Sequence, residues 1–136
     1  MASPAYIAEH GKLESLAEPG KHRLIDAYYD SKKARALHVR WEDVVSGHQI
    51  DPETHVEVFP ETDQTLNAAL LGRGIALLPG NLIEEEIDSG IIDFANPEPI
   101  PAPYKCYFVS PANARPNSAL IAFRDWLVDE LKKFSA

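Results

Sequence analysis

Short apolar runs alternate with segments of helical spacing over the first two-thirds of the chain. Residues 22–28 (HRLIDAY) are a candidate for a short strand, and residues 55–59 (HVEVF) alternate with period two, which places Val56 and Val58 on one face. Residues 75–78 (IALL) are continuously apolar and end at a Pro-Gly pair, a pattern typical of a strand covered on both faces. The pattern therefore predicts three short strands.

A helix is predicted between the second and the third of these strands. Thr62 or Asp63 can cap its start, and Gly72 supplies a left-handed stop at its end. Its apolar stripe consists of Leu66, Ala69 and Leu70. Strand, helix and strand in this order fit a right-handed parallel crossover.

Two further short segments flank this unit. Residues 38–45 (HVRWEDVV) carry their apolar side chains at near-helical spacing. Residues 82–87 predict another short helix, which Gly90 closes, and residues 91–94 (IIDF) predict a short strand after it. Alternation of strands and helices predicts an α/β fold with a largely parallel sheet.

The last third of the chain begins with a proline-rich stretch, residues 96–103, which is typical of an extended connector. Residues 104–109 (YKCYFV) predict a strand, and Asn117 begins a long terminal helix. The apolar stripe of this helix is formed by Leu120, Phe123, Leu127, Leu131 and Phe134, widened by Ile121 and Val128. We expect this helix to pack against another surface.

Composition is typical of one soluble domain that spans residues 1–136. The chain has 45% hydrophobic and 25% charged residues, and its length supports a single core. Thirteen Lys and Arg against 21 Asp and Glu give a net charge of −8, so we expect no DNA binding by this chain itself. A single cysteine favours a reducing compartment and a cytoplasmic location. We expect no export and no membrane partner, because no signal peptide or long apolar run is found.

Catalytic and metal-binding patterns are weak. His48 and His55 flank two acidic residues, but their spacing matches neither helical nor strand pairing of metal ligands. Cys106 lies in an apolar strand candidate, a setting that leaves a thiol inert. Nucleophile-elbow, phosphate-loop and dinucleotide motifs are not found, and the acidic run at 84–86 is typical of the solvated face of a helix. We therefore expect no metal, no cofactor and no enzymatic activity.

Four segments together resemble the effector-binding domain of LysR-type transcriptional regulators, in the branch similar to the glycine-cleavage activator. Their order and spacing cover nearly the whole chain. They are SPAYIAEHG at 3–11, GRGIALLP at 72–79, LIEEEIDSGII at 82–92 and FRDWLVDEL at 123–131.

The resemblance implies a fold like that of type 2 periplasmic binding proteins, with two α/β subdomains joined by crossing strands around a small-molecule cleft. It implies that this chain starts at the first crossing strand and contains the second subdomain, with a largely parallel mixed sheet flanked by helices. The chain then returns through residues 104–109 and ends in a helix that belongs against the first subdomain. The resemblance implies that residues 1–136 do not include that subdomain or the N-terminal helix-turn-helix through which the family contacts DNA.

Candidate effector contacts follow from where ligands bind on open α/β sheets, beyond the carboxyl ends of the strands. This rule selects Phe59, Pro60, Glu61 and Thr62, and the family is similar in using the loop at this position. The alternative is an ordinary helix cap. Because Glu61 and Asp63 already place negative charge at this helix end, an effector is expected not to place a carboxylate there.

A second candidate is the segment 26–33 (DAYYDSKK). It offers Tyr28 and Tyr29 as flat walls, with Lys32 and Lys33 as anion contacts. The alternative is a solvated loop with one aromatic side chain in the core. Trp41 has a counterpart in the family, but a role in the core or on a helix face is favoured.

The sequence thus predicts the effector-sensing part of a LysR-type regulator, which binds a small molecule and forms a homo-oligomer. The alternative is a stand-alone interaction module of truncated α/β fold whose exposed terminal helix pairs with a partner chain.

Overall fold

The computed structural model comprises two compact units, residues 1–103 and 104–136, each of which is described by itself. The residues that it describes are 1–16, 19–20, 22–28, 39–45, 54–96, 99–101, 107–111 and 117–132.

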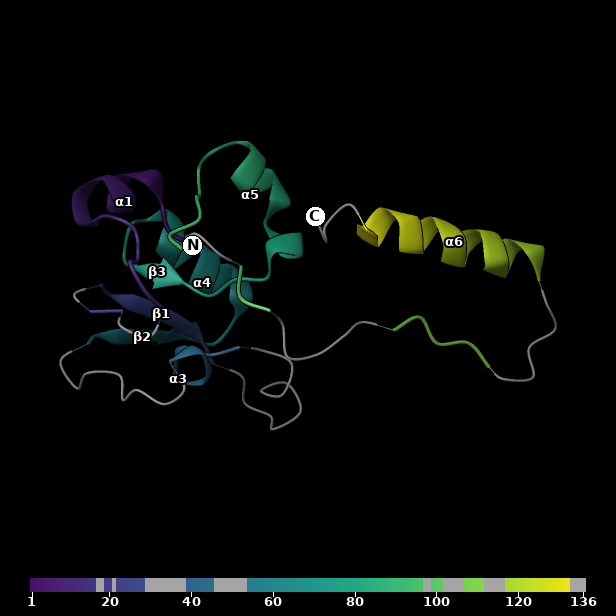
Figure 1. Ribbon diagram of the computed structural model, residues 1–136, viewed down its shortest axis with the longest axis horizontal. Coiled ribbons are helices and arrows are strands. Elements are labelled where there is room, and N and C mark those ends of the chain that lie inside the picture. Colours follow the sequence, from purple (N-terminus) through teal and green to yellow (C-terminus); the bar gives the residue numbers. More distant parts are fainter. Residues whose placement is uncertain are drawn as a thin grey trace. The chain divides into compact units, whose positions relative to one another are not determined.

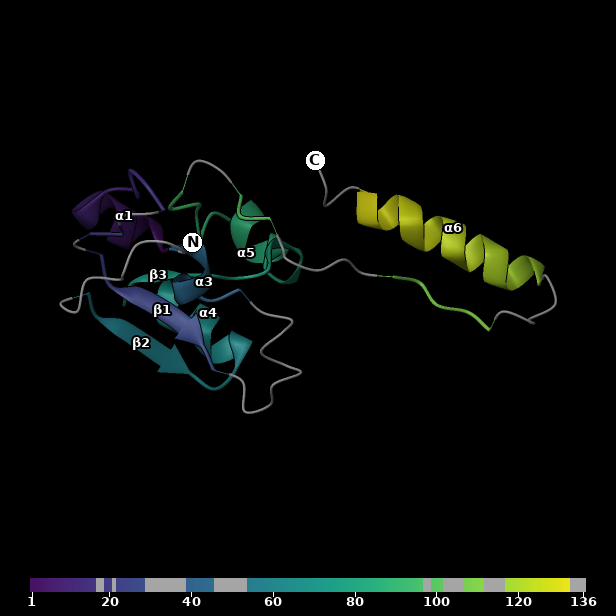
Figure 2. The same ribbon diagram turned by 60° about the horizontal axis from the view of Figure 1, so that its bottom comes forward.

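The first unit contains a parallel sheet of three strands in the order β2-β1-β3, which lie side by side in Figure 2. They are β1 (Leu24–Ala27), β2 (Val56–Phe59) and β3 (Ile75–Ala76). In register, Leu24 of the central strand lies between Val56 and Ile75. The α/β class, the parallel sheet and all three expected strands are confirmed.

The first two residues run in extended conformation beside β3. Met1 and Ala76 exchange two hydrogen bonds, of 2.6 and 2.8 Å, and Ala2 and Asp93 exchange another two, of 3.0 and 2.9 Å, in an antiparallel bridge. The strand expected over residues 91–94 is therefore limited to this single bridge. The helix before it ends at Gly90, where φ is 73°.

The segment of family resemblance at residues 3–11 begins with Ser3 and ends at Gly11, directly after the two paired residues. Pro4–His10 form a helix, α1 (Figure 1). The Ser3 hydroxyl accepts a hydrogen bond from the Tyr6 amide at 3.3 Å, proline occupies the first helical turn, and Gly11 ends the helix with φ of 80°. These are the ordinary start and stop signals of a helix.

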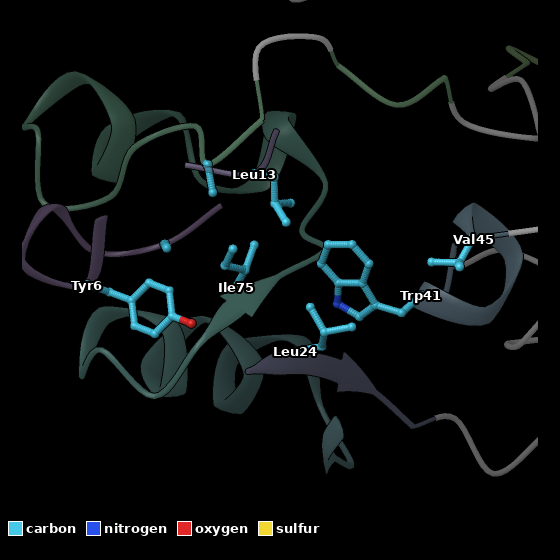
Figure 3. Packing of buried hydrophobic residues seen from close by; sticks show 8 residues of the cluster. Tyr6, Leu13, Leu24, Trp41, Val45 and Ile75 are labelled. Atoms are coloured by element: carbon cyan, nitrogen blue, oxygen red, sulfur yellow. The ribbon is translucent and has the colours of Figure 1, made fainter. Parts of the chain in front are cut away.

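Helices cover both faces of the sheet because neighbouring residues of a strand point to opposite faces. On one face, α1 and α3 (Trp41–Val44) pack over Leu24 and Ile75. Figure 3 shows Trp41 and Val45 approaching from α3, Tyr6 from α1 and Leu13 from the segment after it. Val56 joins this cluster, whereas Val58, expected on the same face, is exposed.

The opposite face carries α4 (Thr62–Leu70), the single turn η1 (Gly80–Leu82) and α5 (Glu84–Asp88). The second cluster of buried side chains on this face consists of Ile25, Ala68, Ala69, Ala76, Ile83 and Ile92. Small alanines on α4 allow close approach to the sheet, while larger apolar side chains, among them Leu66 and Leu70, are partly buried around them.

The two ends of α4 differ in how well the sequence predicted them. Its N-cap is Glu61, not Thr62 or Asp63, because the chain is still extended at Glu61. At the other end Gly72 adopts φ of 72°, as expected. The Gly72 and Arg73 amides donate to the Ala69 and Ala68 carbonyls at 3.0 and 3.1 Å, which satisfies two of the last carbonyls of the helix.

The second unit contains the long helix α6 (Ser118–Lys132), preceded by Asn117, whose side chain accepts a hydrogen bond from the Ala119 amide at 2.9 Å. The strand expected over residues 104–109 is wrong for residues 107–109, which have no paired neighbour among the described residues and are irregular. Residues 104–106, including Cys106, lie outside the described part, as does Phe134. No residue of α6 is buried.

Candidate functional site

The connections that leave β1 and β2 run to opposite faces of the sheet. After β1 the chain reaches α3, which packs on the face of Leu24, and after β2 it reaches α4, which packs on the face of Ile25. Two adjacent parallel strands whose connections diverge in this way mark the point where open α/β sheets bind ligands. The candidate site therefore lies at the carboxyl ends of β1 and β2.

Tyr28 and Phe59 meet at this point. The Tyr28 amide donates a hydrogen bond to the Phe59 carbonyl at 2.6 Å, which continues the pairing of Ala27 with Phe59 by one residue. Tyr28 is 52% exposed. The two segments that the sequence analysis selected separately are thus brought together. Tyr29, Lys32 and Lys33 lie outside the described residues.

The Phe59 side chain belongs partly to the core. It packs against the second cluster, and the Arg73 guanidinium lies 5.4 Å from the centre of its ring. Arg73 also forms an ion pair with Glu57, which precedes Phe59 on the same face of β2. One face of the Phe59 ring is therefore covered by a cation, an arrangement that fixes the ring by cation–π attraction.

Pro60, Glu61 and Thr62 carry the chain from β2 into α4. Pro60 and Glu61 are exposed, and Thr62 is half-buried at the first position of the helix. Asp63 accepts a hydrogen bond from the Gln64 amide at 2.9 Å. The carboxylates of Glu61 and Asp63 thus lie at the N-terminal end of α4, where the helix dipole is positive, and they disfavour binding of a further anion there.

A buried carboxylate at the same edge was missed in the sequence analysis. Asp26 of β1 is 2% exposed, and its Oδ1 accepts a hydrogen bond from the Trp41 amide at 3.3 Å. Its Oδ2 lies 3.4 Å from Nε of Arg40 in an ion pair. Burial raises the pKa of the Asp26 carboxyl, and the Trp41 amide and Arg40 oppose this shift. The sequence did contain a signal for this burial, because Asp26 is a charged residue in the middle of an apolar strand.

Trp41 joins α3 to the sheet through its side chain as well. Its indole Nε1 donates to the Ile25 carbonyl at 3.1 Å, and the residue is 1% exposed. The core role favoured for Trp41 is confirmed.

At the opposite end of β1, two histidines surround the buried Tyr6. The His10 ring stacks on the Tyr6 ring at 4.3 Å between centres, and the Tyr6 hydroxyl accepts a hydrogen bond from the Arg23 amide at 3.1 Å. His22 Nδ1 lies 3.4 Å from the same hydroxyl. Burial lowers the pKa of His22, and His10 lowers it further. These contacts connect α1 to the start of β1.

Within the described residues, no three His, Cys, Asp or Glu side chains are grouped as metal ligands. His48, Asp51 and Glu53 lie outside those residues. No helix in the described part of the chain is long and apolar enough to cross a membrane.

Comparison with known proteins agrees with this architecture. The LysR substrate binding domain profile matches residues 1–132. The chain belongs to the LysR substrate-binding domain family. This is a family of transcription regulators and not of enzymes.

A curated relative of this family, from Haemophilus influenzae (strain ATCC 51907 / DSM 11121 / KW20 / Rd), is named "Glycine cleavage system transcriptional activator homolog". It is 29% identical over 134 residues, which cover 98% of this chain and 42% of the relative. The chain thus spans less than half the length of this LysR-type relative. No solved structure gives a significant match.

Proposed function

We propose that this chain is the effector-sensing part of a LysR-type transcriptional regulator, with a fold of the type 2 periplasmic-binding-protein class. The family match over residues 1–132 and the similarity to a named transcriptional activator support a regulatory role. Such a role places the protein in the cytoplasm. DNA contact would require a helix-turn-helix, because the net charge of −8 on residues 1–136 opposes binding to a duplex.

The meeting of Tyr28 and Phe59 at the switch point of the sheet is the observation that carries the effector site. A flat, half-exposed aromatic ring beside a helix start is suited to a small molecule with both apolar and polar groups. In this proposal Tyr28 is a wall of the site, and Pro60, Glu61 and Thr62 line its floor. Phe59 acts mainly by fixing the turn into α4, since its ring is packed against the second cluster and Arg73.

The negative charge at the start of α4 limits which functional group of an effector can lie there. Glu61 and Asp63 stand at the start of the helix and favour a cation or a neutral hydrogen-bond donor over a carboxylate. A zwitterionic effector would therefore turn its amino group toward α4 and its carboxylate away from it. An effector changes regulation only if it binds one arrangement of the protein more tightly than another.

Titration of the ¹⁵N-labelled chain with three small probes tests the site and its charge preference together. The probes are glycine, ethanolamine and acetate, which carry both charges, an amino group alone and a carboxylate alone. Glycine is included because the relative is named for the glycine cleavage system. We expect the two amino compounds to shift the amide signals of Tyr28 and Thr62, and acetate to leave them in place.

Two variants and one control make this test specific to the site. Tyr28→Ala and Thr62→Val should each weaken binding of the amino compounds, whereas Tyr107→Ala, at an exposed position in the second unit, should leave it unchanged. Shifts that map to α1 or α6 instead, or that acetate reproduces, would refute the proposed site.

The second candidate function, an interaction module, is favoured by one observation. No residue of α6 is buried, and Phe123, Trp126 and Leu131 are among its exposed apolar side chains. Apolar surface of this kind is usually covered by another protein surface. We propose a homo-oligomer as its simplest form, and the association test below separates the two cases.

A further inference from the structure

The contacts of Asp26 join two places that are distant in the sequence. The carboxylate lies in β1, two residues before Tyr28, and both of its oxygens face the start of α3. The chain that leaves β1 at Tyr28 comes back to the same carboxylate at Arg40 and Trp41. The residues at which the connection leaves β1 and enters α3 are therefore both close to the Asp26 carboxylate.

The direction of these contacts explains why an ionised carboxylate is suited to the position. The Trp41 amide is one of the first N–H groups of α3, which has no acceptor within its own helix, so a carboxylate oxygen satisfies it. The Arg40 guanidinium balances the negative charge, and Glu42 pairs with the far side of the same guanidinium at 2.9 Å. Arg40 and Glu42 are the charged side chains that act on Asp26.

We infer that Asp26 is a positioning residue for the effector site: its carboxylate holds the start of α3 against β1 and so fixes where the chain leaves the sheet at Tyr28. As far as it concerns effector binding, the inference rests on the proposed function. Because Asp26 itself is 2% exposed, it would act on the site through Tyr28 and Arg40.

The first experiment needs no ligand. Amide signals of Tyr28 and Trp41 are followed by ¹H–¹⁵N NMR while the pH of the whole chain is lowered. We expect both signals to report one common midpoint, above the ordinary range of an aspartate because of burial. Asp26→Asn should abolish this transition in both signals.

Two neighbouring variants should move that midpoint in opposite directions. Arg40→Gln removes a positive charge that favours ionised Asp26, so the midpoint should rise. Glu42→Gln removes a negative charge that disfavours it, so the midpoint should fall. A carboxylate that merely fills space in the core would not couple Tyr28 to these changes. If Tyr28 fails to follow the Trp41 transition, the inference is overturned.

The second experiment uses whichever probe binds in the titration above. Asp26→Asn should raise its Kd at least about tenfold, a change that corresponds to about 1.4 kcal/mol. Glu42→Gln is the matched control, because Glu42 pairs with the same arginine and leaves the Asp26 carboxylate in place, and its Kd should stay within about twofold of the wild-type value. If Asp26→Asn does not fold, Arg40→Gln takes its place.

The two experiments fail separately. If no probe binds, the proposed function loses its support while the coupling of Tyr28 to Asp26 is still decided by the pH titration. If a probe binds and Asp26→Asn leaves its Kd unchanged, the positioning role is wrong and the proposed site stands.

Discussion

Helices α4 and α6 share an amphipathic pattern and differ completely in burial. The nine residues of α4 include three that are buried, Thr65, Ala68 and Ala69, whereas none of the fifteen residues of α6 is buried. Local signals do not explain the difference, since α6 has a side-chain cap in Asn117 and the N-cap of α4 makes no side-chain hydrogen bond. Helix formation and helix burial are thus decided by different properties of the chain.

Connectivity accounts for the burial of α4. It follows β2 directly and leads within a few residues into β3, and β1 separates these two strands in the sheet. A crossover of this kind must lie against the sheet that it spans. Its smallest side chains therefore face the strands. Within the described residues of the second unit no strand lies next to α6, so its stripe has no such surface of its own.

Truncating one leucine in each region should give the largest contrast. Leu24 of β1 is fully buried. Leu24→Ala should lower the free energy of unfolding by about 4 kcal/mol, because the removed side chain no longer leaves water on folding and leaves a cavity in the core. Leu131 of α6 is 43% exposed, and Leu131→Ala should cost less than about 0.5 kcal/mol. Urea denaturation measures both. Equal losses would show that the two regions are packed alike.

Gly74→Ala should give the next largest loss of stability, because the added methyl group would collide with the backbone where β3 lies next to β1. A Cβ at this position would lie 2.4 Å from the Arg23 carbonyl oxygen, which accepts the Ile75 amide at 2.8 Å. We expect a loss of about 3 kcal/mol, since a backbone atom cannot move aside as a side chain can.

Gly80→Ala is the control for this prediction, because no atom lies within 4 Å of its Cβ position. It should change stability by less than about 0.5 kcal/mol in the same urea experiment. A Gly74→Ala protein as stable as the wild type would mean that β3 pairs with β1 less closely than described.

The amino group of Met1 makes the first unit pH-sensitive. Its burial beside β3 lowers the pKa from 8.0 to about 5, with Asp93 opposing the shift. Between these two values the unfolded chain binds a proton that the folded chain does not, so stability should rise as the pH increases from about 5 to about 8. The full difference corresponds to at most about 4 kcal/mol, and fraying of the terminus should reduce it to about 2 kcal/mol.

Acetylation of the Met1 amino group tests this assignment, because the acetylated group cannot bind the proton. The stability difference between pH 5 and pH 8 should shrink by about 2 kcal/mol in the acetylated chain, with retention of Met1 verified by mass spectrometry. An unchanged pH slope would assign it to other groups, such as His22.

Self-association is the prediction with the smallest effect on the fold. We expect the chain to associate through α6, and Leu127→Glu combined with Leu131→Glu should yield a monomer by light scattering. The change in unfolding free energy should stay below about 1 kcal/mol, since neither side chain is buried. A wild-type chain that is already monomeric at high micromolar concentration would remove the support for an interaction module.

Prediction from sequence succeeded where the signal was local. Alternation and apolar runs placed the three strands, and Gly72 and Gly90 were recognised as helix ends, where both adopt positive φ. It left α1 unassigned, although Ser3, proline and Gly11 are regular helix signals. Residues 107–109 have strand composition and form none, since a strand also needs a neighbour.

The candidate site shows the same division. The rule for parallel strands selected Phe59 to Thr62, and aromatic and basic side chains after the first strand selected Tyr28. The backbones of Tyr28 and Phe59 meet at a hydrogen bond of 2.6 Å. Nothing local indicated that Phe59 would turn its ring into the core, or that Asp26 would bind the start of α3. Both depend on which helix covers which face.

The sequence by itself determined the class of fold, the positions of the strands and the family, because these depend on periodicity, on turn residues and on short motifs. Tertiary structure alone decided which charges are buried, which aromatic side chain is exposed at the strand ends, and that α4 has buried residues while α6 has none. The physical reason is that burial and pairing are properties of contacts between distant segments. Asp26 and Trp41, fifteen residues apart, acquire their roles only when β1 and α3 pack together.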